Sequence, residues 1–268
     1  MKKSILVAAF LLAAAITVEA QQAESAIQNN INKAKERLGD KLLRTADAVI
    51  ANYIEAIGGR AAVSSIKTLM VKGRNARFGQ GDTPLYRYYE QPNLFKQTRS
   101  PEDVNFITSN GVKTWSVSPA GRREVTEWWG ISLKYFRIDG NFIDYKSRGI
   151  EYEYLGLEGF ATEPFVYYHL RRTYPDGFIE DLYFDANTGL LHALWTASSP
   201  IKDSPQVFYD YRQVGGVLFP HAWMRVHDQA SPPHLFIVEE IKLNEDFGQD
   251  FFKQTVECKT TSVSGEIN

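Results

Sequence analysis

The sequence predicts an α+β fold that is mainly β, with an antiparallel sheet of about ten strands and two or more helices. Two observations predict it. Apolar residues recur at helical spacing up to Ile57, and from Thr68 onward they alternate with a period of two. Turn residues separate the strand-like runs that follow, and most loops are short enough to join antiparallel neighbours. No linker rich in proline or serine interrupts the chain, so we expect residues 45–256 to form one domain.

The N-terminus predicts a signal peptide over residues 1–20. Lys2 and Lys3 precede an uncharged apolar run, Ile5–Val18, and Ala20 is a small residue of the kind that signal peptidase requires at its cleavage site. The run is short for a membrane-spanning helix, and no cysteine follows it to accept a lipid. We expect cleavage at this site and release into the periplasm in soluble form. The alternative is an uncleaved N-terminal anchor.

The charge balance narrows the range of partners. The chain carries 30 Lys and Arg against 32 Asp and Glu, which gives a formal net charge of −2 at pH 7. A near-neutral chain argues against nucleic acid, or a broad anionic membrane surface, as the partner. Cys258 is the only cysteine. The chain therefore forms no internal disulfide, and an exported fold must rely on packing.

Two helices are expected before the sheet. Residues 21–44 form a polar, alanine-rich N-terminal extension, in which Ile27 and Ile31 belong to a helical apolar stripe that ends at Gly39. Thr45 is the expected N-cap of a second helix, because its hydroxyl can accept a hydrogen bond from the first turn. This second helix is expected to pack on the sheet through its own stripe, which consists of Val49, Ile50, Tyr53, Ile54 and Ile57.

Turn residues then mark out the strands. Asn110-Gly111 is the clearest signal, a two-residue hairpin turn that joins Val104–Thr108 to Val112–Ser116. Residues 257–268 are polar and are expected to form a frayed tail. The other expected strands, in chain order, are 68–73, Tyr86–Glu90, Leu94–Thr98, Phe165–Thr173, Phe178–Phe184, Leu190–Thr196, Gln206–Arg212, His221–His227 and Leu235–Leu243.

One aromatic segment interrupts the meander of strands. Residues 127–145 carry Trp129, Leu133 and Phe136 at helical spacing, opposite Lys134, and predict a short helix followed by a loop across the sheet. Its rings either line an apolar cavity as a lid or fill the core, because both environments favour aromatic side chains. The candidate ligand-binding residues come from this segment and from the second helix: Trp128, Trp129, Leu133, Phe136, Phe142, Tyr53 and Ile57.

Signals for catalysis or metal binding are weak. None of the five histidines has a zinc-site spacing such as H-E-x-x-H. His221 and His227 share a strand face but stand about 20 Å apart along it, which is too far to share one ion. We therefore expect isolated surface histidines. No serine lies in G-x-S-x-G, and no glycine-rich loop has the phosphate-binding order. The sequence predicts no catalytic residue, no metal and no cofactor.

Polar pairs on the strands have a simple explanation. Glu151 and Glu153 lie on one face of a predicted strand, and Arg87 and Tyr89 do so elsewhere. Paired carboxylates can perform acid–base chemistry, but charged residues on a solvated strand face are commoner. We therefore expect the protein not to be an enzyme.

Several short motifs occur in a fixed order along the chain, beginning with Tyr53–Gly59 followed by Ile66–Leu69. This first pair is similar to the start of many exported outer-membrane lipoprotein-sorting proteins. Asn110-Gly111 with Trp115 resembles the hairpin of that group. The resemblance extends over residues 46–243. Its later motifs are Leu182–Asp185 with Thr188–Leu191, and Tyr209–Arg212 with Gly216-Val217 and Phe219-Pro220.

On these motifs the chain resembles the LolA/LolB-like superfamily of lipoprotein carriers. The resemblance implies a strongly curved antiparallel sheet that forms an unclosed barrel. Helices would cover its open side, and an apolar cavity between helices and sheet would hold acyl chains. The resemblance also implies periplasmic binding and carriage of lipid-linked cargo, without chemistry. The helix expected at about residues 24–38 is additional to the known carriers.

Two hypotheses for the function remain open. The leading one is non-catalytic binding of a hydrophobic or acylated ligand, a lipid or a lipoprotein, in the periplasm. The alternative is an envelope protein–protein interaction module with a packed, ligand-free core, whose partner is another envelope protein. The two differ in whether the aromatic segment at 127–145 covers a hollow or fills it.

Overall fold

The computed structural model describes the chain between residues 2 and 253 apart from four internal segments: it covers 2–77, 80–160, 164–197, 205–225 and 234–253. The chain divides into two compact units. The smaller unit consists of Met1–Ile57 and Gly149–Ala197, and the larger unit of Gly58–Arg148 and Ser198–Asn268. The expected tail at 257–268 lies outside the described residues, and the single domain over 45–256 stays a prediction.

The smaller unit begins with two helices, α1 (Lys2–Leu38) and α2 (Ala46–Ala56), with the 3-10 turn η1 (Gly39–Lys41) between them. Thr45 caps α2 as expected, because its Oγ1 accepts a hydrogen bond from the Ala48 backbone nitrogen at 3.2 Å. Helix α1 continues through the predicted signal peptide, whose cleavage stays a prediction. Within the described residues, no helix is both long enough and apolar enough to cross a membrane.

Four antiparallel strands form the sheet of the smaller unit: β7 (Glu151–Gly159), β8 (Val166–Thr173), β9 (Ile179–Asp185) and β10 (Leu191–Thr196). Their order is β10-β9-β8-β7. Both helices pack on one face of this sheet. Ile31 of α1 belongs to a buried cluster with Val166, and the Tyr53 ring of α2 lies edge-on to Phe184 with 5.3 Å between the ring centroids. The expectation that α2 packs on the sheet is confirmed.

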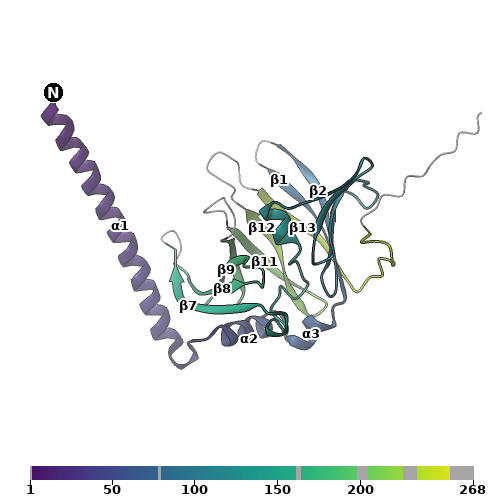
Figure 1. Cartoon of the computed structure of the whole chain (residues 1–268). Coiled ribbons are helices and arrows are strands. Elements are labelled where there is room, and N and C mark those ends of the chain that lie inside the picture. The colour runs from purple at the N-terminus through teal and green to yellow at the C-terminus, as the bar shows by residue number, and fades with distance from the viewer. Residues whose placement is uncertain (1, 78–79, 161–163, 198–204, 226–233, 254–268) are drawn as a thin grey trace, which may run out of the picture. The chain divides into compact units, whose positions relative to one another are not determined.

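Nine antiparallel strands of the described residues form the sheet of the larger unit (Figure 1), in the order β6-β5-β4-β3-β2-β1-β13-β12-β11. The hairpin at Asn110-Gly111 is confirmed, since Ser109 pairs with Thr114 across it. Its loop is four residues long, Asn110 to Lys113, and the expected two-residue turn was wrong. The nine strands are β1 (Thr68–Arg77), β2 (Gln80–Glu90), β3 (Leu94–Thr98), β4 (Phe106–Ser109), β5 (Thr114–Ser118), β6 (Gly121–Glu124), β11 (Gln206–Val214), β12 (Val217–Arg225) and β13 (His234–Leu243).

The larger unit also has three short helical elements: α3 (Arg60–Ser65), α4 (Trp128–Leu133) and the 3-10 turn η2 (Lys146–Arg148). The predicted fold class is confirmed, because the described strands are antiparallel and outweigh the helices. The described residues hold thirteen strands, where about ten were expected. Strand β6 was not predicted because all four of its residues are exposed and it carries no apolar alternation.

Candidate functional site

The two faces of the larger unit's sheet have different coverings. Side chains alternate along β2, so Arg87 and Tyr89 lie on one face and Tyr88 on the other. The first face meets the segment 134–148 through a ring contact of Tyr89, and the second meets Phe247 through Tyr88. We call the first the Arg87 face. Its members are Arg87, Tyr89, Phe95, Gln97, Trp223 and Phe236.

Aromatic rings surround the guanidinium of Arg87. Its Cζ lies 5.0 Å from the ring centroid of Trp223, 5.3 Å from that of Phe236 and 6.0 Å from that of Phe136. Trp223 and Phe236 are cross-strand partners and stack with 4.1 Å between their centroids. The Arg87 Nε donates a hydrogen bond to Gln97 Oε1 at 2.9 Å. A cation this close to ring faces is attracted by their quadrupoles, so the rings hold the charged group in place.

Part of this aromatic group remains accessible to solvent. Tyr89, Phe136 and Trp223 are half-buried, as is Arg87 itself. By contrast, Phe236 beneath them is only 1% exposed. Burial raises the pKa of Tyr89, against an opposing effect of Arg87, so the phenol is neutral at neutral pH. The Arg87 face therefore combines a buried aromatic base with an accessible apolar rim around one cation.

Phe136 reaches the Arg87 face from the segment that follows α4. Its ring makes an edge-on contact with Phe95, with 5.2 Å between the centroids. Helix α4 ends at Leu133, and the Phe136 backbone nitrogen then bonds the Leu133 carbonyl at 3.2 Å in a 3-10 turn. The spacing of Trp129, Leu133 and Phe136 predicted one helical face, but the helix ends before Phe136. Phe136 comes from the loop instead of the helix, because the following residues form a polar hub of their own.

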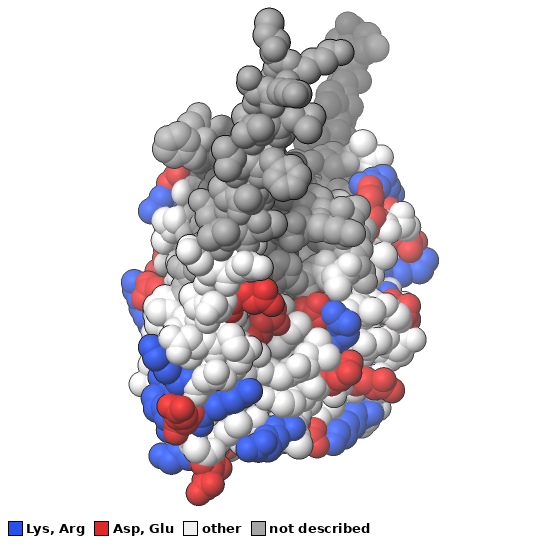
Figure 2. Space-filling view, turned by 90° about the vertical axis from the view of Figure 1, so that its left-hand side faces the viewer, with Lys and Arg blue, Asp and Glu red and all other residues white. Residues whose placement is uncertain are grey.

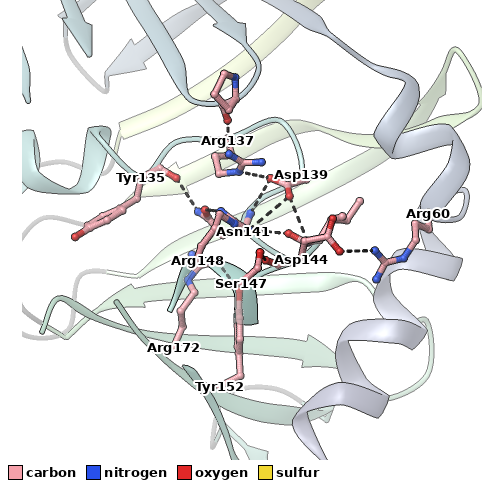
Figure 3. Close-up of polar contacts among 12 residues, drawn as sticks. Arg60, Tyr135, Arg137, Asp139, Asn141, Asp144, Ser147, Arg148, Tyr152 and Arg172 are labelled. Carbon is pink, nitrogen blue, oxygen red and sulfur yellow. Dashed lines mark hydrogen bonds and ion pairs between the residues drawn. The ribbon is translucent and has the colours of Figure 1, made fainter. Parts of the chain in front are cut away.

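That hub is centred on Asp139, a carboxylate that is 8% exposed (Figure 3). Its Oδ1 accepts a hydrogen bond from Arg137 Nε at 2.9 Å and from the Asn141 backbone nitrogen at 3.2 Å. Its Oδ2 accepts from the Ile143 backbone nitrogen at 3.3 Å. A buried carboxylate needs such donors to offset the loss of water. Asp139 thereby shapes the whole loop around itself.

Asn141 and Arg148 close the hub on its other side. Asn141 Nδ2 donates to the Tyr135 carbonyl at 2.7 Å, and Arg148 Nη1 donates to Asn141 Oδ1 at 2.7 Å (Figure 3). The backbone is left-handed at Gly140 and Asn141, with φ of 60° and 70°. Glycine and asparagine tolerate this region better than other residues do. The bonds at Tyr135 and Arg137, on either side of Phe136, determine where its ring points.

Two further contacts tie the loop to its surroundings in the larger unit. Arg137 Nη1 also donates to the carbonyl of Pro92 in the turn between β2 and β3. Asp144 pairs with Arg60 of α3 at 3.1 Å, with side chains 75% and 58% exposed. An exposed pair of this kind contributes about 1 kcal/mol or less. The buried contacts of Asp139 therefore stabilise the loop more than the exposed pair of Asp144 and Arg60 does.

The other predicted ligand residues of the larger unit lie on or after α4. Trp129 and Leu133 are half-buried, and Phe142 is 3% exposed. Helix α4 is attached to the sheet through Thr114, whose Oγ1 donates to the Gly130 carbonyl at 2.8 Å. Trp128 is the first residue of α4, and its side chain lies outside the described residues.

Tyr53 and Ile57 belong to the smaller unit. Ile57 is 7% exposed. Burial raises the pKa of Tyr53, and Arg172 lies close enough to oppose that effect. Arg172 Nε donates to Glu180 Oε2 at 2.9 Å, and these two side chains are 5% and 7% exposed. The Tyr174 hydroxyl also donates to Glu180, at 3.0 Å. This buried pair organises the core of the smaller unit.

Sequence reasoning missed the centre of the Arg87 face. Arg87 and Tyr89 were assigned to a solvated strand face, and the structure corrects this, because aromatic rings surround the guanidinium. Gln97, Trp223 and Phe236 gave no signal, since each belongs to an ordinary strand pattern. The one available hint was an arginine within an aromatic stretch of β2.

His169 of the smaller unit is paired, and so corrects the expectation of isolated surface histidines. Its Nδ1 lies 2.7 Å from Glu158 Oε2 and its Nε2 lies 3.5 Å from Asp181 Oδ1. Burial alone would lower the pKa of His169, but the two carboxylates outweigh burial and raise the pKa to about 9. In the part of the chain that the structure describes, no three His, Cys, Asp or Glu side chains are arranged to hold a metal ion.

A separate hollow of about 560 Å³ in the larger unit has charged side chains of both signs in its lining, beside apolar ones. Mixed charges in its lining do not suit an acyl chain, which needs apolar walls. Its lining residues are Glu90, Leu94, Arg122, Asp246, Gly248, Gln249, Phe252 and Lys253. On the surface coloured in Figure 2, basic and acidic side chains are likewise interspersed, as the near-neutral composition predicts.

Comparison with known proteins gave structural likeness alone. No protein-family model matches the sequence, and no curated protein matches it. The structure is similar to a LolA superfamily protein from Nitrosomonas europaea, with a TM-score of 0.52 and 12% identity over 79% of this chain and 98% of that chain. A DUF1329 family protein from Desulfovibrio piger is similar with a TM-score of 0.53 and 12% identity, over 77% and 96% of the two chains.

A third similar structure is a domain described as that of an outer-membrane lipoprotein-sorting protein, from Vibrio parahaemolyticus. Its TM-score is 0.53 at 10% identity, over 75% of this chain and 95% of that chain. At such identities the likeness establishes the fold alone. It does not establish the function, because function depends on particular sites and not on the fold. The chain has the LolA-like fold that the order of its motifs predicted.

Proposed function

We propose that this protein binds an apolar or lipid-linked ligand in the periplasm and carries it without chemistry. The observation that carries the proposal is the accessible aromatic rim of the Arg87 face, where Tyr89, Phe136 and Trp223 are half-buried. Ligand sites for apolar molecules consist mainly of aromatic and aliphatic walls with few polar groups. The Arg87 face has this composition.

The energetics favour an apolar occupant at this surface. Each Å² of apolar surface removed from water stabilises a complex by about 25 cal/mol, and aromatic side chains offer large areas. The buried base beneath the rim keeps the exposed rings from collapsing inward, since Phe95 and Phe236 already fill that space at 0% and 1% exposure. A ligand therefore meets a preformed surface, which lowers the entropic cost of binding.

The LolA-like fold agrees with this proposal. One similar structure is described as a lipoprotein-sorting domain, so acylated cargo is the natural class of ligand to test first. In this proposal Trp129, Leu133 and Phe136 border the ligand, and Phe142 supports the loop from below. Trp128, Tyr53 and Ile57 are further proposed contacts.

The second candidate function is an envelope interaction module with a packed core and an envelope protein as partner. Phe142 favours it, because this ring of the predicted lid is only 3% exposed and acts as core. Under this alternative the same segment would hold the fold together without binding any ligand. The two functions therefore predict different behaviour with an apolar probe.

A fluorescent fatty-acid probe tests the proposal. We expect saturable binding to the wild type, and weakening by about 5- to 10-fold in Trp129→Ala and in Phe136→Ala, because each loses aromatic contact area. Phe251→Ala is the matched control. It removes a ring from the opposite face, where Phe251 contacts Tyr88 at 4.7 Å between centroids, and should leave probe binding unchanged. A wild type that binds no apolar probe would favour the interaction module.

A further inference from the structure

Arg87 differs in its partners from two other arginines of the described structure, Arg172 and Arg137. Arg172 pairs with Glu180, Arg137 with Asp139, and both pairs have carboxylates 7% exposed or less. Arg87 instead donates to Gln97 and faces aromatic rings. None of the described Asp or Glu side chains forms an ion pair with it.

The surroundings of Arg87 leave its charge uncompensated. The Gln97 amide is neutral, and the nearby Tyr89 phenol stays neutral because burial disfavours its ionised form. Ring quadrupoles attract a guanidinium but do not neutralise it. A partly desolvated cation gains most from an anion that reaches it, through a charge-assisted and often bidentate hydrogen bond.

The geometry puts this cation among the rings of the apolar rim. The guanidinium lies over the rings of Phe136 and Trp223, and both of these side chains are half-buried. The Nε atom is engaged with Gln97, which orients the planar group. A ligand that covers the rings therefore brings its head group to the guanidinium.

We propose that the ligand of this site is an acidic amphiphile: Arg87 binds its carboxylate or phosphate, and Phe136 and Trp223 contact its hydrocarbon chain. This inference rests on the proposed function and goes beyond it by naming the chemistry of the head group. Neutral lipids of the same chain length bind more weakly, because they cover the rings without compensating the charge.

Competition against the bound fluorescent probe tests the head group directly. The competitors are a long-chain fatty acid, its methyl ester, the matching fatty alcohol, and a lysophosphatidate of equal chain length, at about pH 8 where the carboxylic acid is ionised. We expect the acids to compete about 10-fold or more better than the ester and the alcohol. Preference for only one acid identifies the carboxylate or the phosphate as the recognised group.

Variants assign that preference to Arg87. Arg87→Gln should abolish the preference for acids while leaving ester binding within about 2-fold, and Arg87→Lys should keep part of it, because lysine offers a charge without the planar donors. Arg74→Gln is the matched control. It removes the same charge from an arginine that pairs with Asp82 and Glu239 and is 38% exposed, and it should keep the preference.

The failures of the two proposals are distinguishable. Ester and acid competing equally well in the wild type would overturn the acidic head group while leaving apolar ligand binding intact. A preference that survives in Arg87→Gln would also overturn it. A wild type that binds no probe at all would overturn the proposed function itself. The wild-type comparison needs no variant, so it decides the matter even if Arg87→Gln does not fold.

Discussion

Arg137 and Asp139 form an ion pair, 2.9 Å between Nε and Oδ1, immediately after the ring that reaches the Arg87 face. Their side chains are 17% and 5% exposed. Because Asp139 also accepts bonds from the backbone of Asn141 and Ile143, one carboxylate determines the path of the loop. The position of Phe136 is therefore a consequence of polar chemistry three residues further along the chain.

The first prediction concerns Asp139. Asp139→Asn should lower the free energy of unfolding by about 2 kcal/mol, because it removes the charge from a buried set of hydrogen bonds. Asp144→Asn is the matched control, since its pair with Arg60 is exposed and contributes about 1 kcal/mol or less. Urea unfolding curves measure both. Equal effects of the two variants would contradict the central role of Asp139.

The second prediction concerns the buried pair of the smaller unit. Glu180→Leu should destabilise by about 3–5 kcal/mol, because it leaves the charge of Arg172 buried without its partner. The double variant with Arg172→Leu should be less destabilised than Glu180→Leu alone. Thermal unfolding of the single and double variants measures the coupling free energy between Glu180 and Arg172. Additive losses would show that the two side chains act independently.

The third prediction is a pH dependence centred on His169. Its pKa is raised from 6.5 to about 9 by Asp181 and Glu158 against the opposing effect of burial. A raised pKa means that the folded state holds the proton more tightly, so the stabilisation is complete below about pH 6.5 and is lost as the pH rises towards about 9. The loss is on the order of 3 kcal/mol.

Unfolding midpoints measured across that interval check the prediction. The wild type should lose stability between about pH 6.5 and 9, and His169→Gln should lose much less. His221→Gln, a variant in the larger unit, should keep the wild-type slope. A wild-type midpoint that stays constant over this interval would show that His169 is neutral in the folded protein.

The fourth prediction concerns export. The chain should be cleaved after Ala20, since Lys2, Lys3 and the short apolar run form a signal peptide pattern. Intact-mass spectrometry of the protein recovered from the periplasm measures the start of the mature chain. Retention of residues 1–20, or the added mass of an acyl group, would rule out release in the expected form.

The sequence by itself determined the elements whose causes are local. Thr45 predicted the start of α2 because a hydroxyl at this position accepts a bond from the first turn. Asn110-Gly111 predicted a hairpin because Gly111 adopts a φ of 81° without a side-chain clash. Alternation of apolar residues predicted antiparallel strands, and the LolA-like fold was implied by the resemblance of the ordered motifs to a known family.

Tertiary structure alone decided what each strand face meets. Arg87 and Tyr89 have the pattern of a solvated strand face, and only the pairing of β1 with β13 and of β13 with β12 brings Trp223 and Phe236 beside the guanidinium. Such neighbours lie far apart in sequence and leave no local periodicity. The same holds for Phe136, which lies beyond the end of α4 in a loop that is organised by the hydrogen bonds of Asp139.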